Sequence, residues 1–398
     1  MAKEVDRKEY LDELERFKDK KDIIKVITGV RRCGKSTLLL QFVKRLKESG
    51  AERILLINFE NMEFDHIHTH EDFSKFLKEN IDPKERTYVI LDEIQRVSGW
   101  ERSVNGLLAG FNADVYITGS NAYVLSSELS TFLTGRYVTI NMFPLSFSEY
   151  CELHSDSKKD VTELFGLYIR CGAFPSIDPF ADDRVTRTLL SDLYASIVYS
   201  DIMSRGQIRD RANLDKVMRF LMINVGNPVS SNSIAKSLGG IRHETVDRYL
   251  ELLEGSYLFY RADRFDLKST ALSPAPKYYS VDTGLRNAPL GYRHEDRGRL
   301  LENIVYLELL RRGYAVTVGK YGDAEIDFAA MDPNGMTEYF QVTVSMASED
   351  ACNRELRPLR ALDNSFPKTV ISADRDLPSV TRDGIRHIHV VDWLLKKI

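Results

Sequence analysis

Ile23-Ile24-Lys25-Val26-Ile27-Thr28-Gly29-Val30-Arg31-Arg32-Cys33-Gly34-Lys35-Ser36-Thr37 is the stretch that decides the fold of this 398-residue chain. Its first five residues are mostly apolar and β-branched, which predicts a buried strand, and the residues from Thr37 onward have helical spacing. Between them, Gly29 to Ser36 spells the complete pattern G-x-x-x-x-G-K-[ST]. This pattern binds phosphate when a strand leads into it and a helix leaves it. The stretch therefore predicts a nucleotide-binding loop.

The chemistry of such a loop gives each residue type a role. Backbone N–H groups at the start of a helix point at an anion, and the helix dipole favours negative charge there. The Lys35 ammonium reaches the terminal phosphates, and the Ser36 hydroxyl joins the shell of a magnesium ion. A glycine turn, or a loop that has lost its function, is the alternative. The predicted ATP-binding residues are Gly29, Arg32, Cys33, Gly34, Lys35, Ser36 and Thr37.

Length and composition bound the class of protein. A chain of 398 residues exceeds one ordinary core, so several domains are expected. An apolar content of 43% and a charged content of 29% are typical of a globular protein. The net charge of −4 excludes a whole-molecule attraction to DNA or anionic lipid, although a local basic patch is compatible with it. No apolar run can cross a membrane, no signal peptide is visible and a cysteine lies in the loop, so we expect a cytoplasmic protein.

Two acids follow a later apolar run. Over residues 20–150, short β-branched runs alternate with amphipathic stretches, which predicts a parallel sheet flanked by helices. The run 87–91 ends in Asp92-Glu93, and parallel strands present ligand groups at their carboxyl ends. Asp92 would hold magnesium, directly or through water, and Glu93 would polarise the attacking water. A solvated turn is the alternative.

A further run, 114–118, leads into Thr118-Gly119-Ser120-Asn121. A polar side chain at the end of this strand would lie between the two preceding motifs, near a γ-phosphate. We predict that Ser120 or Asn121 fills this role, without choosing between them. The alternative is a capping turn, because Ser and Asn are favoured at the start of helices.

These motifs, with Leu133-Thr134-Gly135-Arg136 and the segment 143–147, resemble the AAA+ ATPases. More narrowly, the chain is similar to a prokaryotic branch with a winged helix and a C-terminal restriction-endonuclease-like domain. The resemblance implies that Ser120 or Asn121 is the first sensor. It also implies that Arg136 is an arginine finger acting on a neighbouring subunit's nucleotide, so that the chain forms a homo-oligomer, and that Asn58 restrains the catalytic glutamate. A structural ion pair is the alternative role for Arg136.

The middle of the chain changes pattern. Residues 148–205 read as helical with a break at 171–175, and they resemble the helical lid of AAA+ proteins. Two helices at 231–238 and 244–253, a glycine turn between them, and strands at 258–262 and 277–281 predict a winged helix-turn-helix. Its second helix carries basic residues that can meet DNA and acidic residues that repel phosphate, so DNA binding and protein contact stay alternatives. The residues that can meet DNA are Arg242, His243, Thr245 and Arg248, and the acidic residues are Glu244, Asp247 and Glu251.

The C-terminal part has the layout of a PD-(D/E)xK nuclease, with a helical Glu302, strand residues Glu325 and Asp327, and a hairpin into a further strand. Active members carry Glu-x-Lys on that strand, where the glutamate completes a metal site and the lysine assists the water. Here the matching residues are Gln341-Val342-Thr343. The three acids could still gather one cation, but cleavage is not expected. The domain is expected to bind a protein partner or nucleic acid, or to support assembly.

The expected architecture is α/β: an AAA+ P-loop core (1–147), a helical lid (148–205), a winged helix (206–285) and an inactive PD-(D/E)xK-like domain (286–398). The expected function is hydrolysis of ATP, with Mg²⁺, to drive conformational change in remodelling of a partner or in nucleic-acid-related work. Two alternatives remain. One is a nucleotide-dependent switch that recruits a protein partner without catalysis, and the other is an ATP-regulated nuclease. No membrane association is expected.

Overall fold

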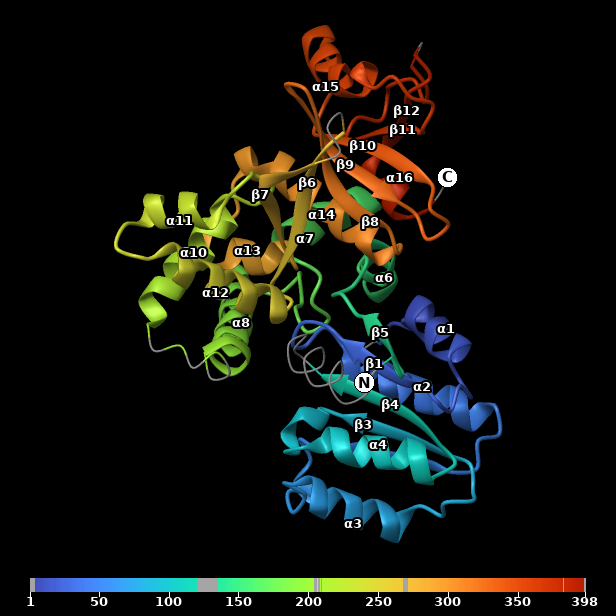
Figure 1. Ribbon diagram of the computed structural model, residues 1–398. Coiled ribbons are helices and arrows are strands. Elements are labelled where there is room, and N and C mark those ends of the chain that lie inside the picture. The colour runs from blue at the N-terminus through green and yellow to red at the C-terminus, as the bar shows by residue number, and fades with distance from the viewer. Residues whose placement is uncertain are drawn as a thin grey trace. The chain divides into compact units, whose positions relative to one another are not determined.

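The computed structural model describes residues 4–119, 135–203, 206, 208, 210–267, 271–381 and 383–396 (Figure 1). The chain divides into two compact units, Met1–Pro144 with Gly255–Tyr257, and Leu145–Glu254 with Leu258–Ile398. Within the described residues, no helix is both long and apolar enough to span a lipid bilayer. The finer division into four ranges stays a prediction from the sequence.

A parallel sheet organises the first unit, with its strands in the order β2-β3-β4-β1-β5. The strands are β1 (Ile24–Thr28), β2 (Ile54–Asn58), β3 (Thr87–Asp92), β4 (Ala113–Gly119) and β5 (Tyr137–Asn141). The α-helices are α1 (Lys8–Arg16), α2 (Lys35–Glu48), α3 (His70–Asn80) and α4 (Trp100–Gly110), with short 3₁₀ turns at Met62–Phe64 and Ile94–Arg96. This order puts β4 between the strand that enters the phosphate loop and the strand that ends in Asp92.

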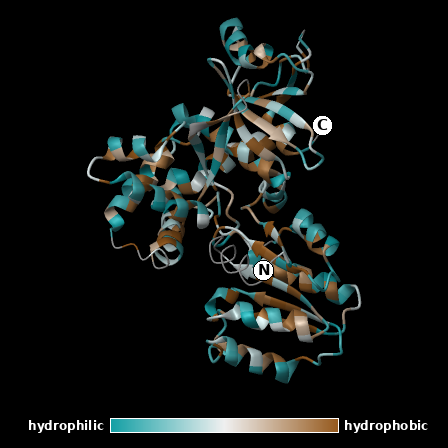
Figure 2. Ribbon diagram, in the orientation of Figure 1, coloured by the Kyte–Doolittle hydropathy of each residue, from teal (hydrophilic) through white to brown (hydrophobic). Residues whose placement is uncertain are grey.

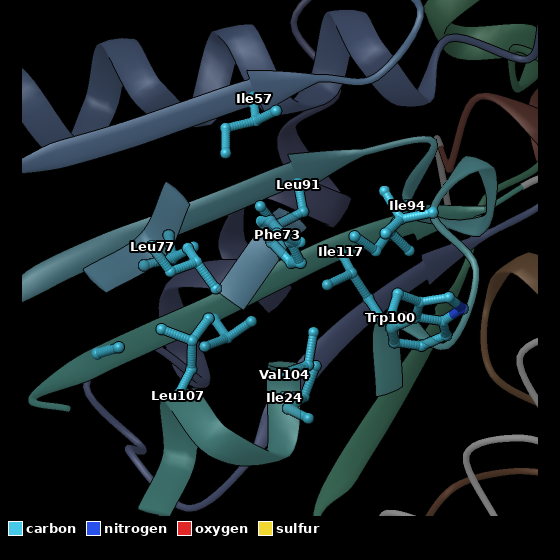
Figure 3. Close-up of a cluster of buried hydrophobic side chains, with 14 of the residues drawn as sticks. Ile24, Ile57, Phe73, Leu77, Leu91, Ile94, Trp100, Val104, Leu107 and Ile117 are labelled. Atoms are coloured by element: carbon cyan, nitrogen blue, oxygen red, sulfur yellow. The ribbon is translucent and has the colours of Figure 1, made fainter. Parts of the chain in front are cut away.

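Apolar side chains hold helices against both faces of this sheet. Helices α3 and α4 cover one face, where Phe73, Trp100 and Leu107 pack on strand residues such as Ile117 (Figure 3). On the opposite face, Phe42 of α2 packs on Tyr116, with ring centroids 4.8 Å apart. Figure 2 shows the hydrophobic residues concentrated on the strands. Each fully buried side chain of this kind contributes about 1.5–3 kcal/mol, so the sandwich holds the strand ends in fixed positions.

The second unit begins with helices. They are α6 (Phe147–Leu153), α7 (Val161–Cys171), α8 (Asp183–Ser196) with a π-helical continuation η3 (Ile197–Met203), α10 (Arg211–Ile223), α11 (Ser231–Leu238) and α12 (His243–Gly255). Helix α7 ends at the predicted break, where Gly172 adopts a φ of 80°. An added Cβ at Gly172 would lie 2.1 Å from Oδ1 of Asp282, so glycine is required there. Helices α11 and α12 form where the sequence predicts helices.

A mixed sheet with the strand order β12-β11-β10-β9-β8-β6-β7 follows in the second unit. The strands are β6 (Phe259–Asp266), β7 (Ala271–Ser280), β8 (Ala315–Tyr321), β9 (Ala324–Met331), β10 (Thr337–Thr343), β11 (Lys368–Ser372) and β12 (Arg386–His389). The helices around it are α13 (Thr283–Leu290), α14 (Arg297–Arg311), α15 (Glu349–Ala361) and α16 (Val390–Leu394), with a 3₁₀ turn at His294–Asp296. The parallel core and this C-terminal α/β region confirm the predicted fold class.

Strands β6 and β7 differ from the expected pair. The sequence predicts strands at 258–262 and 277–281, whereas the observed strands are longer and β6 pairs in parallel with β8. They therefore form one edge of the C-terminal sheet rather than an isolated wing. The physical reason is the β6 residues Arg264–Asp266, which continue the strand and take partners at Val318–Lys320. The winged helix itself stays a prediction.

Candidate nucleotide-binding site

The phosphate loop runs from the end of β1 to the start of α2, and three of its residues have a positive φ. Gly29, Arg32 and Gly34 have φ values of 142°, 64° and 106°. Loops of this kind turn consecutive backbone N–H groups into a concave anion-binding nest. An added Cβ at Gly29 would lie 2.1 Å from the carbonyl oxygen of Met142, so no larger residue fits at that position. The loop therefore has the backbone geometry that phosphate binding requires.

Lys35 is the first residue of α2 and is 5% exposed. Its Nζ donates hydrogen bonds to the carbonyl oxygens of Gly29 at 3.0 Å and Val30 at 3.2 Å, so the ammonium lies inside the loop. Ser36 is exposed in the first helical turn, next to the half-buried Thr37, while Cys33 is buried. The exposed Ser36 hydroxyl is available to a metal ion at the mouth of the loop.

Asp92 lies at the end of β3 and is held on both carboxylate oxygens. Oδ2 accepts a hydrogen bond from Nδ2 of Asn58 at 3.0 Å, and Oδ1 accepts one from Oγ1 of Thr118 at 2.5 Å. A carboxylate has about four acceptor positions, so both oxygens retain one for a further donor. This suits contact with magnesium through a metal-bound water. Among the described residues, no group of three or more His, Cys, Asp or Glu forms a separate metal site.

The position of Asn58 corrects one expectation. The resemblance implies that Asn58 restrains the catalytic glutamate, but its side-chain amide contacts Asp92 instead. The reason is strand register, because β2 pairs with β3 so that Asn58 lies directly opposite Asp92. The Asn58 Oδ1 accepts from the backbone N–H of Glu60 at 2.7 Å, which fixes its orientation.

Glu93 sits in a left-handed backbone conformation directly after β3, with φ 55° and ψ 43°. Its N–H donates to Oγ1 of Thr118 at 2.9 Å, and its carboxylate accepts from Nε2 of Gln95. Burial raises the pKa of Glu93, and the nearby Lys35 ammonium opposes that rise. A left-handed non-glycine residue costs about 1–3 kcal/mol and is common at functional sites. The glutamate is thus strained, half-buried and within electrostatic reach of the phosphate loop.

Thr118 is a residue of this site that no sequence motif indicates. It is buried at the end of β4, and its single hydroxyl contacts both the Asp92 carboxylate and the Glu93 amide. The predicted sensors Ser120 and Asn121 lie outside the described residues. The sequence did contain a signal for Thr118. A threonine near the end of a central parallel strand lies at the edge of the sheet where the carboxyl ends of the other strands meet.

Arg7 is a second residue that no motif indicates. Its guanidinium is buried just before α1, and it donates to the carbonyl oxygens of Cys33 at 3.1 Å and Phe143 at 2.8 Å. The Gln41 side chain of α2 anchors the same segment by donating to the Val5 carbonyl at 2.8 Å. Arg7 thus joins the phosphate loop to the chain after β5. Its distance of more than twenty residues from the loop hides this role in the sequence.

Arg136 immediately precedes β5, and its carbonyl accepts from the N–H of Ile24 at 2.8 Å. Its side chain is exposed. An exposed guanidinium can contact a second molecule, which the predicted arginine-finger role requires. The finger role and the oligomer that it implies stay predictions.

Comparisons with known proteins agree with this geometry. A family described as "AAA domain" matches residues 21–151, and a family described as "Domain of unknown function (DUF8612)" matches residues 162–296. A protein of Haemophilus influenzae titled "Uncharacterized protein" is 40% identical over 98% of this chain and 99% of its own length. A protein of Methanocaldococcus jannaschii, also titled uncharacterized, is 31% identical over 92% of this chain and 86% of its own. The chain belongs to this family of AAA-domain proteins.

A solved structure, the Aeropyrum pernix Orc1 protein in complex with DNA, is similar to this AAA-domain protein over 72% of this chain and 93% of that chain. The identity is 10% and the TM-score is 0.31, so the likeness carries no argument here. The AAA-domain match is more informative, because it includes the phosphate loop, both acids after β3 and Arg136. It leaves out Arg7, so the contact of that residue with the loop is visible only in the structure.

Proposed function

We propose that this protein binds ATP with magnesium and hydrolyses it to drive a conformational change. The observation that supports the proposal best is the phosphate loop between β1 and α2, whose left-handed residues form an anion-binding nest and whose carbonyls hold the Lys35 ammonium. Glu93 directly follows β3 of the same parallel sheet, and the charge of Lys35 opposes the rise in the pKa of this glutamate. The family match supports nucleotide binding by the same residues.

Each side chain has a task in this proposal. Lys35 and the N–H groups of the loop hold the β- and γ-phosphates, and bound magnesium would neutralise charge on those oxygens. Ser36 and Asp92 would hold that ion, Asp92 through a bound water. Glu93 orients the attacking water and takes up its proton. The Thr118 hydroxyl positions Glu93 by accepting a hydrogen bond from the Glu93 backbone N–H. The same hydroxyl donates a hydrogen bond to the Asp92 carboxylate.

The conformational change that follows ATP hydrolysis has several candidate targets. The AAA core is covalently continuous with the second unit at Pro144–Leu145 and on both sides of Gly255–Tyr257. In the second unit, Arg242 and His243 are exposed at the start of α12, where DNA could be met. Arg248 is a weaker candidate for contact with DNA than the sequence implies, because its Nη2 donates a hydrogen bond to the Gly206 carbonyl at 2.5 Å. DNA and a protein partner are the two candidate targets of the motion.

Steady-state phosphate release from Mg-ATP tests the proposal, with wild type measured beside Glu93→Gln and Lys35→Ala. We expect turnover in the wild type at the scale of ordinary enzymes, about 10 s⁻¹ or below. We expect Glu93→Gln to bind ATP without turnover, and Lys35→Ala to lose binding as well. Tight binding without turnover in the wild type would replace the enzyme with a nucleotide switch. Adding duplex DNA to each reaction tests whether nucleic acid is the partner.

The oligomer that the Arg136 proposal requires is tested separately. Glu93→Gln should hold ATP long enough for its mass to be measured by analytical ultracentrifugation. We expect a larger species with ATP than without it, and Arg136→Ala in the same background should reduce that species or its turnover when mixed with wild type. A mass that ATP does not change would contradict the finger role and would leave the hydrolysis proposal intact.

A further inference from the structure

Charged side chains from four elements of the second unit converge at one place beside β7. They are Lys277 of β7, Glu302 of α14, Glu325 and Asp327 of β9, and Arg264 of β6. Three acids in this layout are what a nuclease of the PD-(D/E)xK type uses to gather a divalent cation. The question is therefore what these acids hold here.

Lys277 lies at the centre of the group. Its Nζ is 3.0 Å from Oε1 of Glu302 and 2.9 Å from Oε1 of Glu325, and the residue is 3% exposed. The Tyr279 hydroxyl donates to the same Glu302 oxygen at 2.7 Å. The carboxylates therefore point at an ammonium that the protein itself supplies.

Two further carboxylate oxygens accept hydrogen bonds. Nη2 of Arg264 donates to Oε2 of Glu325 at 2.7 Å. Oδ2 of Asp327 accepts from the N–H of Val342 at 2.8 Å. A hydrated divalent cation at this place would have to displace the lysine and the arginine.

The charges balance without a metal. Burial and the charge of Glu302 raise the pKa of Asp327 well above its usual range, which favours its neutral form. The carboxylates of Glu302 and Glu325 then face the cations of Lys277 and Arg264, two against two. The Lys277 ammonium is buried, and a buried ion pair offsets its loss of hydration only when further hydrogen bonds satisfy its members, as the Tyr279 hydroxyl does for Glu302.

Gln341 is a further residue that distinguishes this cluster from a metal site. The amide stands where active nucleases have a metal-binding carboxylate, and its Oε1 accepts from the N–H of Asp327 at 3.4 Å. We propose that the Lys277 ammonium takes the place of the divalent cation, so that this acidic group is a metal-free ion cluster joining α14 to strands β7 and β9. The residues do not fit a metal centre, and the cluster is incompatible with metal-dependent cleavage while Lys277 is present.

Titration with Mn²⁺, followed by the electron paramagnetic resonance signal of the free ion, tests this inference. The full chain is used without nucleotide and with Asp92→Asn, so that the phosphate-loop site contributes no binding. Lys277→Met in that background is expected to bind one Mn²⁺ about tenfold tighter or more than the parent, because a positive charge beside the acids is removed. Adding Glu302→Gln should abolish that gain. A folded Lys277→Met chain without a gain would overturn the inference.

A second comparison does not require Lys277→Met to fold. The parent and its Glu302→Gln variant should give the same Mn²⁺ binding curve, because Glu302 is already occupied by Lys277. Binding by the parent that Glu302→Gln removes would show that the cluster takes a metal with Lys277 in place, and the inference would fail. Neither result depends on ATP hydrolysis, so failure here is distinguishable from failure of the proposed function.

Discussion

At the scale of single residues, Thr118 connects the two acids at the end of β3. Its hydroxyl donates to Asp92 and accepts from the Glu93 amide. Thr118→Val keeps the shape of the side chain and removes both hydrogen bonds. Bonds to charged groups contribute about 1.5–3 kcal/mol, so turnover should fall by about 10- to 100-fold while ATP affinity changes little.

The Thr118 prediction is checked by steady-state phosphate release and by equilibrium titration with a fluorescent ATP analogue. Thr118→Ser retains the hydroxyl and is the matched control, expected to keep most of the turnover. A valine variant with wild-type turnover would mean that the strand geometry alone orients Glu93.

Arg7 gives a second prediction at this scale. Arg7→Ala leaves the carbonyls of Cys33 and Phe143 without these hydrogen bonds, at about 1–3 kcal/mol for each buried acceptor. We expect weaker ATP binding together with a lower melting temperature. Arg16→Ala, which removes an exposed arginine at the end of α1, should change neither quantity. Equal ATP affinity for the two variants would exclude a role of Arg7 in shaping the loop.

The sequence places the loop between a strand and a helix, as the structure has it, because the spacing of the motif is itself the constraint. Gly29, Lys35 and Ser36 belong to one short segment of the chain, and the motif already contains their order. Thr118 and Arg7 depend on which strands become neighbours, which no local pattern encodes. Asn58 was assigned to the wrong acid because its partner is set by the register between β2 and β3.

At the scale of elements, Asp282 joins the break after α7 to the start of α13. Its carboxylate accepts from the N–H groups of Ala173 at 2.6 Å and Leu285 at 2.9 Å. Burial raises the pKa of Asp282 to about 6. The folded state therefore holds this proton more tightly than the unfolded state, whose aspartate pKa is about 3.9.

The sign of the resulting pH dependence follows from that difference. The contribution of protonated Asp282 to the stability of the folded state is fully present below about pH 4 and is lost as the pH rises through about 6. The unfolding free energy of wild type minus that of Asp282→Asn should therefore fall by about 2 kcal/mol from pH 4 to pH 7. Urea denaturation at both pH values measures it. A constant difference would mean that Asp282 is ionised in the fold throughout.

The sheet of the first unit contains a buried ion pair between β1 and β4. Lys25 and Asp114 are both fully buried, and Asp114 also accepts from the Tyr116 hydroxyl at 3.0 Å. Asp114→Ala leaves an unpaired ammonium in the core and should cost about 3–5 kcal/mol. The exposed pair of Asp12 with Arg45 is the control, because Asp12→Ala should cost about 1 kcal/mol or less. Thermal unfolding compares the two, and similar losses would contradict the account.

Strands and helices were easier to predict than their assembly. The helices 231–238 and 244–253 form within two residues of the predicted limits, because apolar spacing and caps act locally. Strands β6 and β7 were read as a separate wing, since nothing in their own sequence reveals that β6 pairs with β8, some fifty residues further on. Pairing between distant strands is decided by the collapsed chain rather than by local pattern.

At the scale of the whole molecule, the sequence separates what the chain retains from what it has lost. The first unit has a phosphate loop after β1 and two acids at the end of β3, and β4 lies between these two strands of the parallel sheet. In the second unit, Glu302 and Glu325, which the sequence predicts to belong to a nuclease-like layout, face Lys277 and Arg264. Chemistry is therefore expected at the AAA core, while the second unit transmits or receives the change of shape.

The most direct test of this account is the nucleotide that the protein retains after incubation with Mg-ATP, separated from free nucleotide and identified by chromatography. We predict ADP on the wild type and ATP on Glu93→Gln, because the glutamine keeps the binding site but cannot take up a proton from water. ADP on both proteins, formed at the same rate, would contradict the assignment of Glu93 and the mechanism built on it.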